Sequence, residues 1–326
     1  MSDIVLQDPV PMKKTREGFG HALVDLGEKD PRVVVMVGDL TESTMVSFFA
    51  EKFPDRFFEI GIAEQNMASI AAGLAATGKI PFFATYGAFA SCRSADQIRV
   101  SIAYSNLPVK IGGAHGGISV GPDGATHQAM EEFAIIRSIP NMSLVVPCDY
   151  WEARKATRAA AATPGPVYIR FGREDVPVVT DESTPFTFGK GEVFGQGTDV
   201  TVIACGVMVY EALRARAVLA GKGVSVRVIN LHTIKPLDRE IIVKAARETG
   251  AIVTAEEHQV NGGLGGAVAE VLVQECPVPA EMVAVHDRFG QSGKPAELMA
   301  AFGLKEKDVI EAIERVLARK GAPAHA

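Results

Sequence analysis

The chain has 326 residues, 47% of them hydrophobic and 22% charged, which is enough for two domains that each bury a core. Asp and Glu outnumber Lys and Arg by 39 to 33 without a basic stripe, which argues against a nucleic-acid-binding protein. Four cysteines without CxxC spacing, and no run near the ~18 apolar residues that a membrane helix needs, favour a cytoplasmic protein that contacts no membrane.

Short apolar runs in the first half of the chain predict buried strands. They are rich in β-branched and aromatic residues along their whole length, as parallel strands covered by helices on both faces are. The expected strands are residues 33–40, 81–87, 109–115, 143–147 and 167–172. Apolar residues at positions i, i+3, i+4 and i+7 predict a helix over 64–78, with Gly78 as its C-terminal cap.

Residues 176–197 are rich in Thr, Pro, Gly and Asp, and we expect them to form a linker. The alternation of strands and helices then resumes. Strands are expected at 200–206, 226–231, 251–258 and 282–287, and helices after 209, 238 and 266 and over 308–320. This order predicts an α/β protein with two domains, 1–185 and 186–326, each with a mainly parallel sheet flanked by helices.

Glu64 lies where an apolar strand meets a helix in FEIGIAEQNM. A glutamate in the first turn of a helix most often complements the helix dipole. The alternative is a ligand-binding group, because open α/β sheets bind ligands at the carboxyl ends of their strands. The segment alone favours the first interpretation.

The glycine-rich loop 113–128 contains His115, Asp123 and His127. Its glycines allow the loop to bring two imidazoles and a carboxylate together. A surface turn is the plain alternative. A metal site is another alternative, although the spacings of eight and four residues between positions 115, 123 and 127 match no strong metal-binding template.

A second glycine-rich segment, VNGGLGGAVAE at 260–270, is superficially like a dinucleotide-binding loop. It departs from GxGxxG because Val268 stands at the third glycine position. We therefore expect a tight turn into a helix, whose N-terminus is able to hold an anion.

Taken in chain order, seven segments resemble the transketolase family over nearly the whole sequence. They are TREGFG, VGDLTEST, FEIGIAEQNMASIAAGLA, TYGAFASCRSADQIR, AHGGISVGPDGATHQ, PVYIRFGR and EEHQVNGGLGGAVAE. The resemblance implies the pyrimidine-binding and C-terminal domains of an enzyme that uses thiamine diphosphate. The implied reaction transfers a two-carbon ketol group from a ketose phosphate to an aldose phosphate.

The family's diphosphate-binding motif is missing from this sequence. That motif is GDG followed at a distance by an Asn pair, whereas the chain has only GDL at 38–40 and no two adjacent asparagines. The resemblance thus implies that Mg²⁺ and the diphosphate are bound by a separate N-terminal transketolase subunit. An α2β2 heterotetramer is the expected assembly.

The resemblance also implies roles for individual residues. Glu64 matches the glutamate that hydrogen-bonds the aminopyrimidine ring, Tyr86 and Phe89 match aromatic residues around that ring, and Asp39 matches a carboxylate near the cofactor. His115 and His127 match residues that bind the sugar and move protons at its carbonyl oxygen. The remaining substrate-binding candidates are Asp123 for the sugar hydroxyls, and Arg16, Ser43 and Arg173 for the phosphate.

Two other readings of the sequence stay open. One is the beta subunit of a 2-oxoacid dehydrogenase, which has a similar length, domain order and cofactor glutamate. The pair Asp123 and His127, together with the phosphate-binding candidates, favours the transketolase reading, since a decarboxylase of small oxoacids has no use for them. The other is a non-catalytic assembly subunit that has kept the fold.

Overall fold

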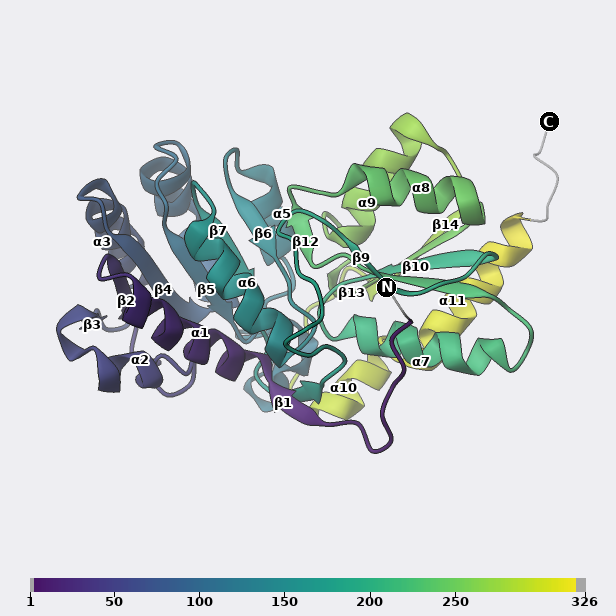
Figure 1. Cartoon of the computed structure of the whole chain (residues 1–326), viewed down its shortest axis with the longest axis horizontal. Coiled ribbons are helices and arrows are strands. Elements are labelled where there is room, and N and C mark those ends of the chain that lie inside the picture. Colours follow the sequence, from purple (N-terminus) through teal and green to yellow (C-terminus); the bar gives the residue numbers. More distant parts are fainter. Residues whose placement is uncertain (1–2, 321–326) are drawn as a thin grey trace.

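In the computed structural model, residues 3–320 are described, and they fold as two α/β units with one large sheet each (Figure 1). The N-terminal sheet has seven strands in the order β12-β6-β7-β5-β4-β2-β3. Their bounds are β2 Val33–Val37, β3 Phe57–Glu59, β4 Ile80–Tyr86, β5 Lys110–Ala114, β6 Ser143–Val145, β7 Val167–Arg170 and β12 Thr233–Lys235. All neighbours are parallel except β12, which pairs antiparallel with β6.

Side chains along these strands alternate between two cores, as the period of a pleated strand requires. Val35 and Phe82 face a layer made by α1 (Thr15–Lys29), α2 (Ser47–Lys52) and α6 (Tyr150–Ala162). Met36 and Phe83 face the opposite layer. That layer contains α3 Glu64–Ala76, η2 Phe89–Arg93, α4 Ala95–Gln97, η3 Ile98–Ala103 and α5 Glu132–Ser138.

The C-terminal sheet has five strands in the order β14-β13-β10-β11-β9. Their bounds are β9 Glu192–Gly195, β10 Val200–Ala204, β11 Val226–Asn230, β13 Ile252–Gln259 and β14 Ala280–Val285. One face packs against α7 (Met208–Ala220), α10 (Pro295–Ala301) and α11 (Glu306–Lys320). The other packs against α8 (Arg239–Thr249) and α9 (Leu264–Glu275), which lie on the opposite side of the sheet in Figure 1.

One apolar core runs through both units. It joins Met67 and Phe133 of the N-terminal unit to Ile203, Ile242 and Leu264 of the C-terminal unit. Burial of apolar surface is the main stabilising term in folding and association, so a continuous core holds the two units together.

The predicted fold class is confirmed, and each apolar run named above overlaps a strand. The linker prediction over 176–197 is wrong in its second half, because β9 is an edge strand that pairs antiparallel with β11. At the start of that segment β8 (Asp175–Pro177) pairs with β1 (Met12–Lys14). Short edge strands bury few side chains, so they lack the apolar pattern that marks the central ones. The domain boundary between residues 185 and 186 stays a prediction.

Helix starts follow ordinary capping chemistry where the sequence offers an acid. Asp238, from which a helix was expected, accepts the N–H of Ile241 and caps α8, which ends at Gly250 with a φ of 62°. None of the helices within residues 3–320 combines the length and apolar character needed to cross a bilayer.

Candidate active site

The candidate residues gather where the parallel strands of the N-terminal sheet end. Tyr86 is the last residue of β4 and pairs with Ala114 of β5, so His115 lies beside it at the same edge. The other candidates follow neighbouring strands in the same way: Asp39 and Ser43 after β2, Glu64 after β3, and Arg173 after β7. Parallel strands place their carboxyl ends together, which makes this edge the usual ligand site of an open α/β sheet.

Four rings form a contact cluster at this edge. The ring centroid of Tyr86 is 4.1 Å from that of His115 and 5.6 Å from that of His127. Phe89 approaches His127 edge-on at 5.2 Å and lies 5.9 Å from Tyr86. Residues from β4, η2 and the loop 113–128 thus meet as the resemblance implied, and the cluster presents flat surfaces suited to a heteroaromatic ring.

His115 is buried at this cluster, with 2% of its surface exposed. Burial, reinforced by the positive charges of Arg16 and Arg173, lowers its pKa to about 3, so the imidazole is neutral near pH 7. Its Nδ1 is buried and has no hydrogen-bond partner in the described part of the chain. A neutral imidazole has one donor and one acceptor nitrogen, so His115 can exchange a proton with an oxygen placed against it.

Arg16 reaches the same edge from the first turn of α1. Its Nη1 donates to the backbone oxygen of Ser43 at 2.8 Å, and the Tyr86 hydroxyl donates to Ser43 Oγ at 3.3 Å. Burial and the nearby charge of Arg173 lower the pKa of Arg16 from its usual value. The Nε of Arg16 is buried and unpartnered within residues 3–320, so the guanidinium has a donor to offer to an anion.

Arg173 and Asp123 are joined to one another. Arg173 Nη1 donates to Asp123 Oδ1 at 2.9 Å and to the backbone oxygen of Val120 at 3.2 Å. These bonds attach the glycine-rich loop to the end of β7. Across residues 3–320 no group of three or more His, Cys, Asp or Glu side chains is arranged to hold a metal ion, and the carboxylate of Asp123 points to an arginine.

Glu64 is the first residue of α3, and its side chain is 2% exposed. Its Oε2 accepts a hydrogen bond of 2.8 Å from Nη1 of Arg93, whose guanidinium lies 4.1 Å from the ring centroid of Phe89. Sequence reasoning missed Arg93. The residue lies in a π-helical turn, where the i to i+5 spacing departs from the 3.6 period used to read helices.

Asp39 stands apart from the ring cluster. Its backbone has a φ of 57°, and its N–H donates to Glu59 Oε1 at 2.6 Å. Glu59 also accepts from Thr41 and Gly61, and so shapes the loop after β2. The Asp39 side chain is exposed, and the structure places no other candidate in hydrogen-bond contact with it among residues 3–320.

A pocket of about 860 Å³ opens beside Arg93, the partner of Glu64, between the two units. One wall includes Phe89, Cys92 and Arg93, and the other includes Asn261 and Phe289. Phe289 is 80% exposed, and an exposed aromatic at the rim of a groove is typical of a surface that binds a partner or ligand.

The segment 260–270 makes the expected tight turn into α9, which begins at Leu264. The anion at this helix start is the chain's own Glu256, which accepts the N–H groups of Leu264 and Gly265 at 2.6 and 2.7 Å. A Cβ on Gly263 would lie 2.1 Å from a Glu256 oxygen, so glycine is required there.

Comparison with known proteins gives consistent matches along the chain. Residues 12–179 match the family model of the transketolase pyrimidine binding domain, and residues 189–309 match that of the transketolase C-terminal domain. The 6-deoxy-6-sulfo-D-fructose transketolase subunit of Clostridium sp. (strain MSTE9) is 43% identical over 94% of this chain and 95% of its own length. A putative transketolase C-terminal section from Methanocaldococcus jannaschii is 44% identical over 92% and 95%.

A solved structure is similar over the same range. It is a split gene transketolase in an inactive beta4 tetramer, 48% identical to this chain, with a TM-score of 0.89. The match covers 94% of this chain and 99% of that one, so both units and their arrangement are shared.

Proposed function

The chain belongs to the transketolase family, where it corresponds to the C-terminal subunits of split-gene members, and on that premise we propose that it forms a thiamine-diphosphate-dependent transketolase with a second polypeptide. That partner is an N-terminal subunit that binds the diphosphate through Mg²⁺. The complex transfers a two-carbon ketol group from an anionic ketose to an aldose phosphate. An α2β2 heterotetramer with two shared sites is the assembly we propose.

The contact cluster of Tyr86, Phe89, His115 and His127, with Glu64 buried beside it, carries this proposal. The residues fit the cofactor's ring, since they provide aromatic surfaces and a carboxylate in a nearly dry position. When bound, thiamine diphosphate supplies the nucleophilic carbon for ketol transfer. Glu64 would share a proton with a nitrogen of the bound ring, and this hydrogen bond would fix the tautomer of the ring.

The two histidines act on the sugar. His115 is neutral, its ring lies 4.1 Å from that of Tyr86, and its Nδ1 has no partner among residues 3–320, so it can hold a proton at the carbonyl oxygen of the substrate. His127 meets the Tyr86 and Phe89 rings edge-on, with its Nδ1 2.8 Å from Thr126 Oγ1. Asp123 holds Arg173 in place and provides an acceptor for sugar hydroxyls.

Arg16 and Arg173 bind the anionic end of the substrate. The positive charges of both guanidiniums lower the pKa of His115, so both lie near its ring. The Nε of Arg16 has no partner among residues 3–320 and can donate to an anion. A planar fork of donors engages either a phosphate or a sulfonate. The relative named for 6-deoxy-6-sulfo-D-fructose makes a sulfonated ketose a second donor to test beside the pentose phosphates.

The dehydrogenase and assembly-subunit readings fit these contacts less well. The substrate of a decarboxylase of small oxoacids carries no phosphate or sulfonate, beyond its reacting carboxylate, for Arg16 and Arg173 to bind. A chain that had lost catalysis would not need to keep unpartnered buried atoms on His115 and Arg16, because such atoms destabilise the fold.

The test reconstitutes the chain with a partner that carries GDG and an Asn pair, together with thiamine diphosphate and MgCl₂. Ketol transfer is assayed from xylulose 5-phosphate, fructose 6-phosphate or 6-deoxy-6-sulfofructose to ribose 5-phosphate. We expect turnover of at least one ketose by the complex and none by either chain alone. Release of CO₂ from pyruvate with transfer to a lipoyl acceptor, and no reaction of any ketose, would reverse the assignment.

A further inference from the structure

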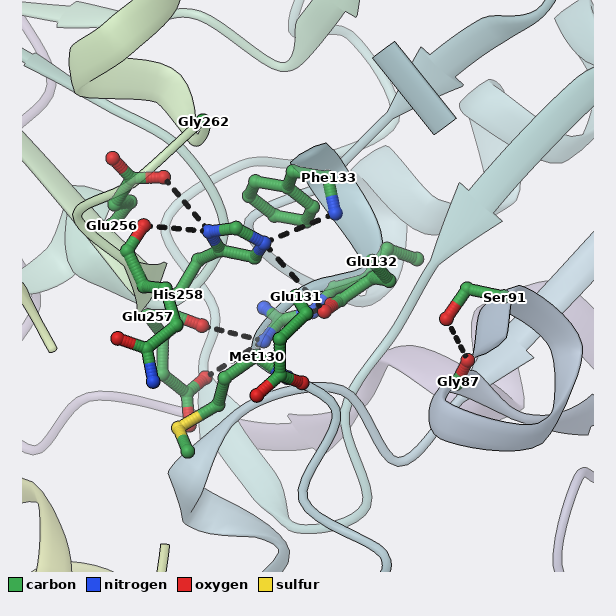
Figure 2. A network of polar contacts seen from close by, with 12 residues as sticks. Gly87, Ser91, Met130, Glu131, Glu132, Phe133, Glu256, Glu257, His258 and Gly262 are labelled. Carbon is green, nitrogen blue, oxygen red and sulfur yellow. Dashed lines mark hydrogen bonds and ion pairs between the residues drawn. The ribbon is translucent and has the colours of Figure 1, made fainter. Parts of the chain in front are cut away.

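A buried polar network lies between the two units, under the loop 113–128 (Figure 2). It consists of Glu132, Arg170, Glu256, Glu257 and His258. Each of these side chains is at most 4% exposed, although each carries an ionisable group. The catalytic scheme above uses none of them, so their burial needs another explanation.

Arg170 and His258 are both bound by neighbouring groups of the chain. Arg170 lies between Glu132 and Glu257, with Nε 3.3 Å from Glu132 Oε1 and Nη2 3.5 Å from Glu257 Oε2. His258 donates from Nδ1 to the backbone oxygen of Gln259 at 2.7 Å. Its Nε2 accepts the N–H of Phe133, as Figure 2 shows. Burial lowers the His258 pKa to about 3, so the ring is neutral and both nitrogens are used.

Glu257 differs from the others because its second oxygen reaches the loop. Oε1 accepts the backbone N–H of Ser119 at 2.6 Å. Ser119 belongs to η4 (Ile118–Asp123), the turn between His115 and His127. A carboxylate from β13 of the C-terminal unit therefore binds the backbone of the segment that carries the proposed sugar-binding residues.

The loop backbone lies directly on this network. A Cβ on Gly117 would come within 2.2 Å of Glu257 Cδ, and a Cβ on Gly116 within 2.1 Å of Arg170 Nε. Gly117 also has a φ of 90°, which L side chains avoid. Glycines at these positions thus allow the loop to sit against the carboxylate and the guanidinium.

A second contact from the C-terminal unit holds the far end of the loop. The buried amide of Gln128 donates to the backbone oxygens of Ile118 and Gly121 and, at 2.9 Å, to that of Gln291. The loop is therefore fixed at both ends by the C-terminal unit, by Glu257 near its start and by Gln291 near its end.

We propose that Glu257 is a positioning residue for ketol transfer, which rests on the proposed function. It acts through the Ser119 N–H and Arg170, and it sets where His115, Asp123 and His127 stand relative to the rings of Tyr86 and Phe89. Small displacements of the two histidines reduce the rate of the chemical step more than they reduce binding of a cofactor whose ring would still be held by Glu64, Tyr86 and Phe89 and whose diphosphate would be held by the partner subunit.

Two variants test the proposal, Glu257→Ala and Glu257→Gln. Glutamine keeps an oxygen that can accept the Ser119 N–H and loses the charge facing Arg170, so it serves as a partial rescue. Glu211→Ala is the matched control. Glu211 is also a 3% exposed carboxylate of the C-terminal unit that accepts one backbone N–H, from Glu306, and one cation, Lys305, but it does not contact the loop.

The first measurement is hydrogen exchange of the full chain, read by mass spectrometry on peptides covering 113–128. We expect exchange there to accelerate at least tenfold in Glu257→Ala, less in Glu257→Gln, and not at all in Glu211→Ala. The second is kinetics of the reconstituted complex, where kcat should fall about tenfold in Glu257→Ala, which corresponds to ~1.4 kcal/mol, and recover in part in Glu257→Gln. The KM for thiamine diphosphate should stay within twofold.

Unchanged loop exchange in Glu257→Ala, or an equal effect in Glu211→Ala, would overturn the proposal. A raised KM for thiamine diphosphate with normal kcat would do so too. If the wild-type complex transfers no ketol group, the proposed function fails and the catalytic part of this inference fails with it. The exchange experiment then still decides whether Glu257 holds the loop.

Discussion

Two clusters of polar side chains lie a short distance apart in this protein, and they differ in what surrounds their polar atoms. In the buried polar network, Arg170, Glu256 and Glu257 bind groups of the chain itself. At the sheet edge, His115 and Arg16 keep buried nitrogen atoms that residues 3–320 leave without a partner. An unpaired buried donor or acceptor costs about 1–3 kcal/mol. Glu132 Oε2 of the network and His232 Nε2 elsewhere are also unpartnered among the described residues, so it is their position beside the ring cluster that marks the His115 and Arg16 nitrogens for a ligand.

This contrast separates two kinds of contribution to function. The network should determine how stable the protein is and where the loop stands, while the sheet edge should determine the reaction and its substrate. Changes in the first cluster are therefore expected to alter unfolding, and changes in the second to alter turnover with little effect on unfolding.

The largest expected effect on stability comes from Arg170→Met. This change leaves the carboxylate of Glu257 buried without its cation, and removing one partner from a buried ion pair typically costs about 3–5 kcal/mol. Glu132 adds little near pH 7, because burial raises its pKa to about 8 and keeps the carboxyl mostly protonated. Urea unfolding of the full chain, followed by circular dichroism, measures the loss. Arg154→Met is the control: it removes one of the two arginines that pair with the partly exposed Asp25, so it should cost less than about 1 kcal/mol. Similar losses in both variants would show that the network is not specially stabilising.

The opposite pattern is expected for Glu64→Gln. Turnover of the reconstituted complex should fall at least 100-fold, about 2.7 kcal/mol in the transition state, because the amide cannot share a proton with the cofactor ring. Unfolding should change by less than about 1 kcal/mol, since the partner of Glu64 is Arg93, whose side chain is 43% exposed. Glu51→Gln, on the exposed side of α2, is the control. Near-normal turnover of Glu64→Gln would refute the assignment of the glutamate.

Much of the fold could be predicted because the central strands are apolar along their whole length. The runs at 33–40 and 81–87 contain β2 and β4, and the glycine at 78 follows α3 with a φ of 87°. β9 and β12 were missed for a physical reason. They are short strands whose partners, β11 and β6, lie far along the chain, and pairing of that kind leaves no local pattern.

The residues at the sheet edge could be predicted from the sequence, but the residues that hydrogen-bond to them or to their loop could not. His115, His127, Tyr86 and Phe89 meet because parallel strands end together, which a strand prediction already implies. Arg93 and Glu257 could not be recognised in this way. One lies in a π-helical turn, and the other is a charged residue inside a buried strand whose partner Ser119 is 138 positions away.

Arg16→Met tests whether the open donor at the sheet edge serves an anionic substrate. A hydrogen bond to a charged group contributes about 1.5–3 kcal/mol, so kcat/KM for xylulose 5-phosphate should fall about tenfold to 100-fold. The value for a ketose without a phosphate or sulfonate should fall much less. Arg32→Met, at an exposed pair with Asp30, should leave both values unchanged. An equal loss for charged and uncharged ketoses would place the anion elsewhere.

The smallest expected effect concerns a buried histidine that lies outside both clusters. His232 follows β11, its ring stacks on Phe186 at 4.2 Å, and its Nε2 is buried without a partner in the described residues. Burial lowers its pKa to about 3, whereas the unfolded chain has a value near 6.5. Folding therefore favours the neutral ring, so its contribution to stability is complete above pH 6.5 and is lost as the pH falls toward 3.

Because the stabilising contribution of His232 is lost as the pH falls, His232→Leu should change the pH dependence of unfolding as well as its midpoint. Between pH 7.5 and pH 5.5 the wild-type chain should lose about 1.4 kcal/mol through this histidine alone, a loss that the variant avoids. Urea unfolding at both pH values measures the difference, and Phe186→Leu controls for altered packing because it removes no titratable group. If wild type and His232→Leu differ equally at both pH values, His232 titrates normally in the folded chain. An unpartnered nitrogen would then carry no electrostatic cost here, and the contrast between the two polar clusters would lose its energetic basis.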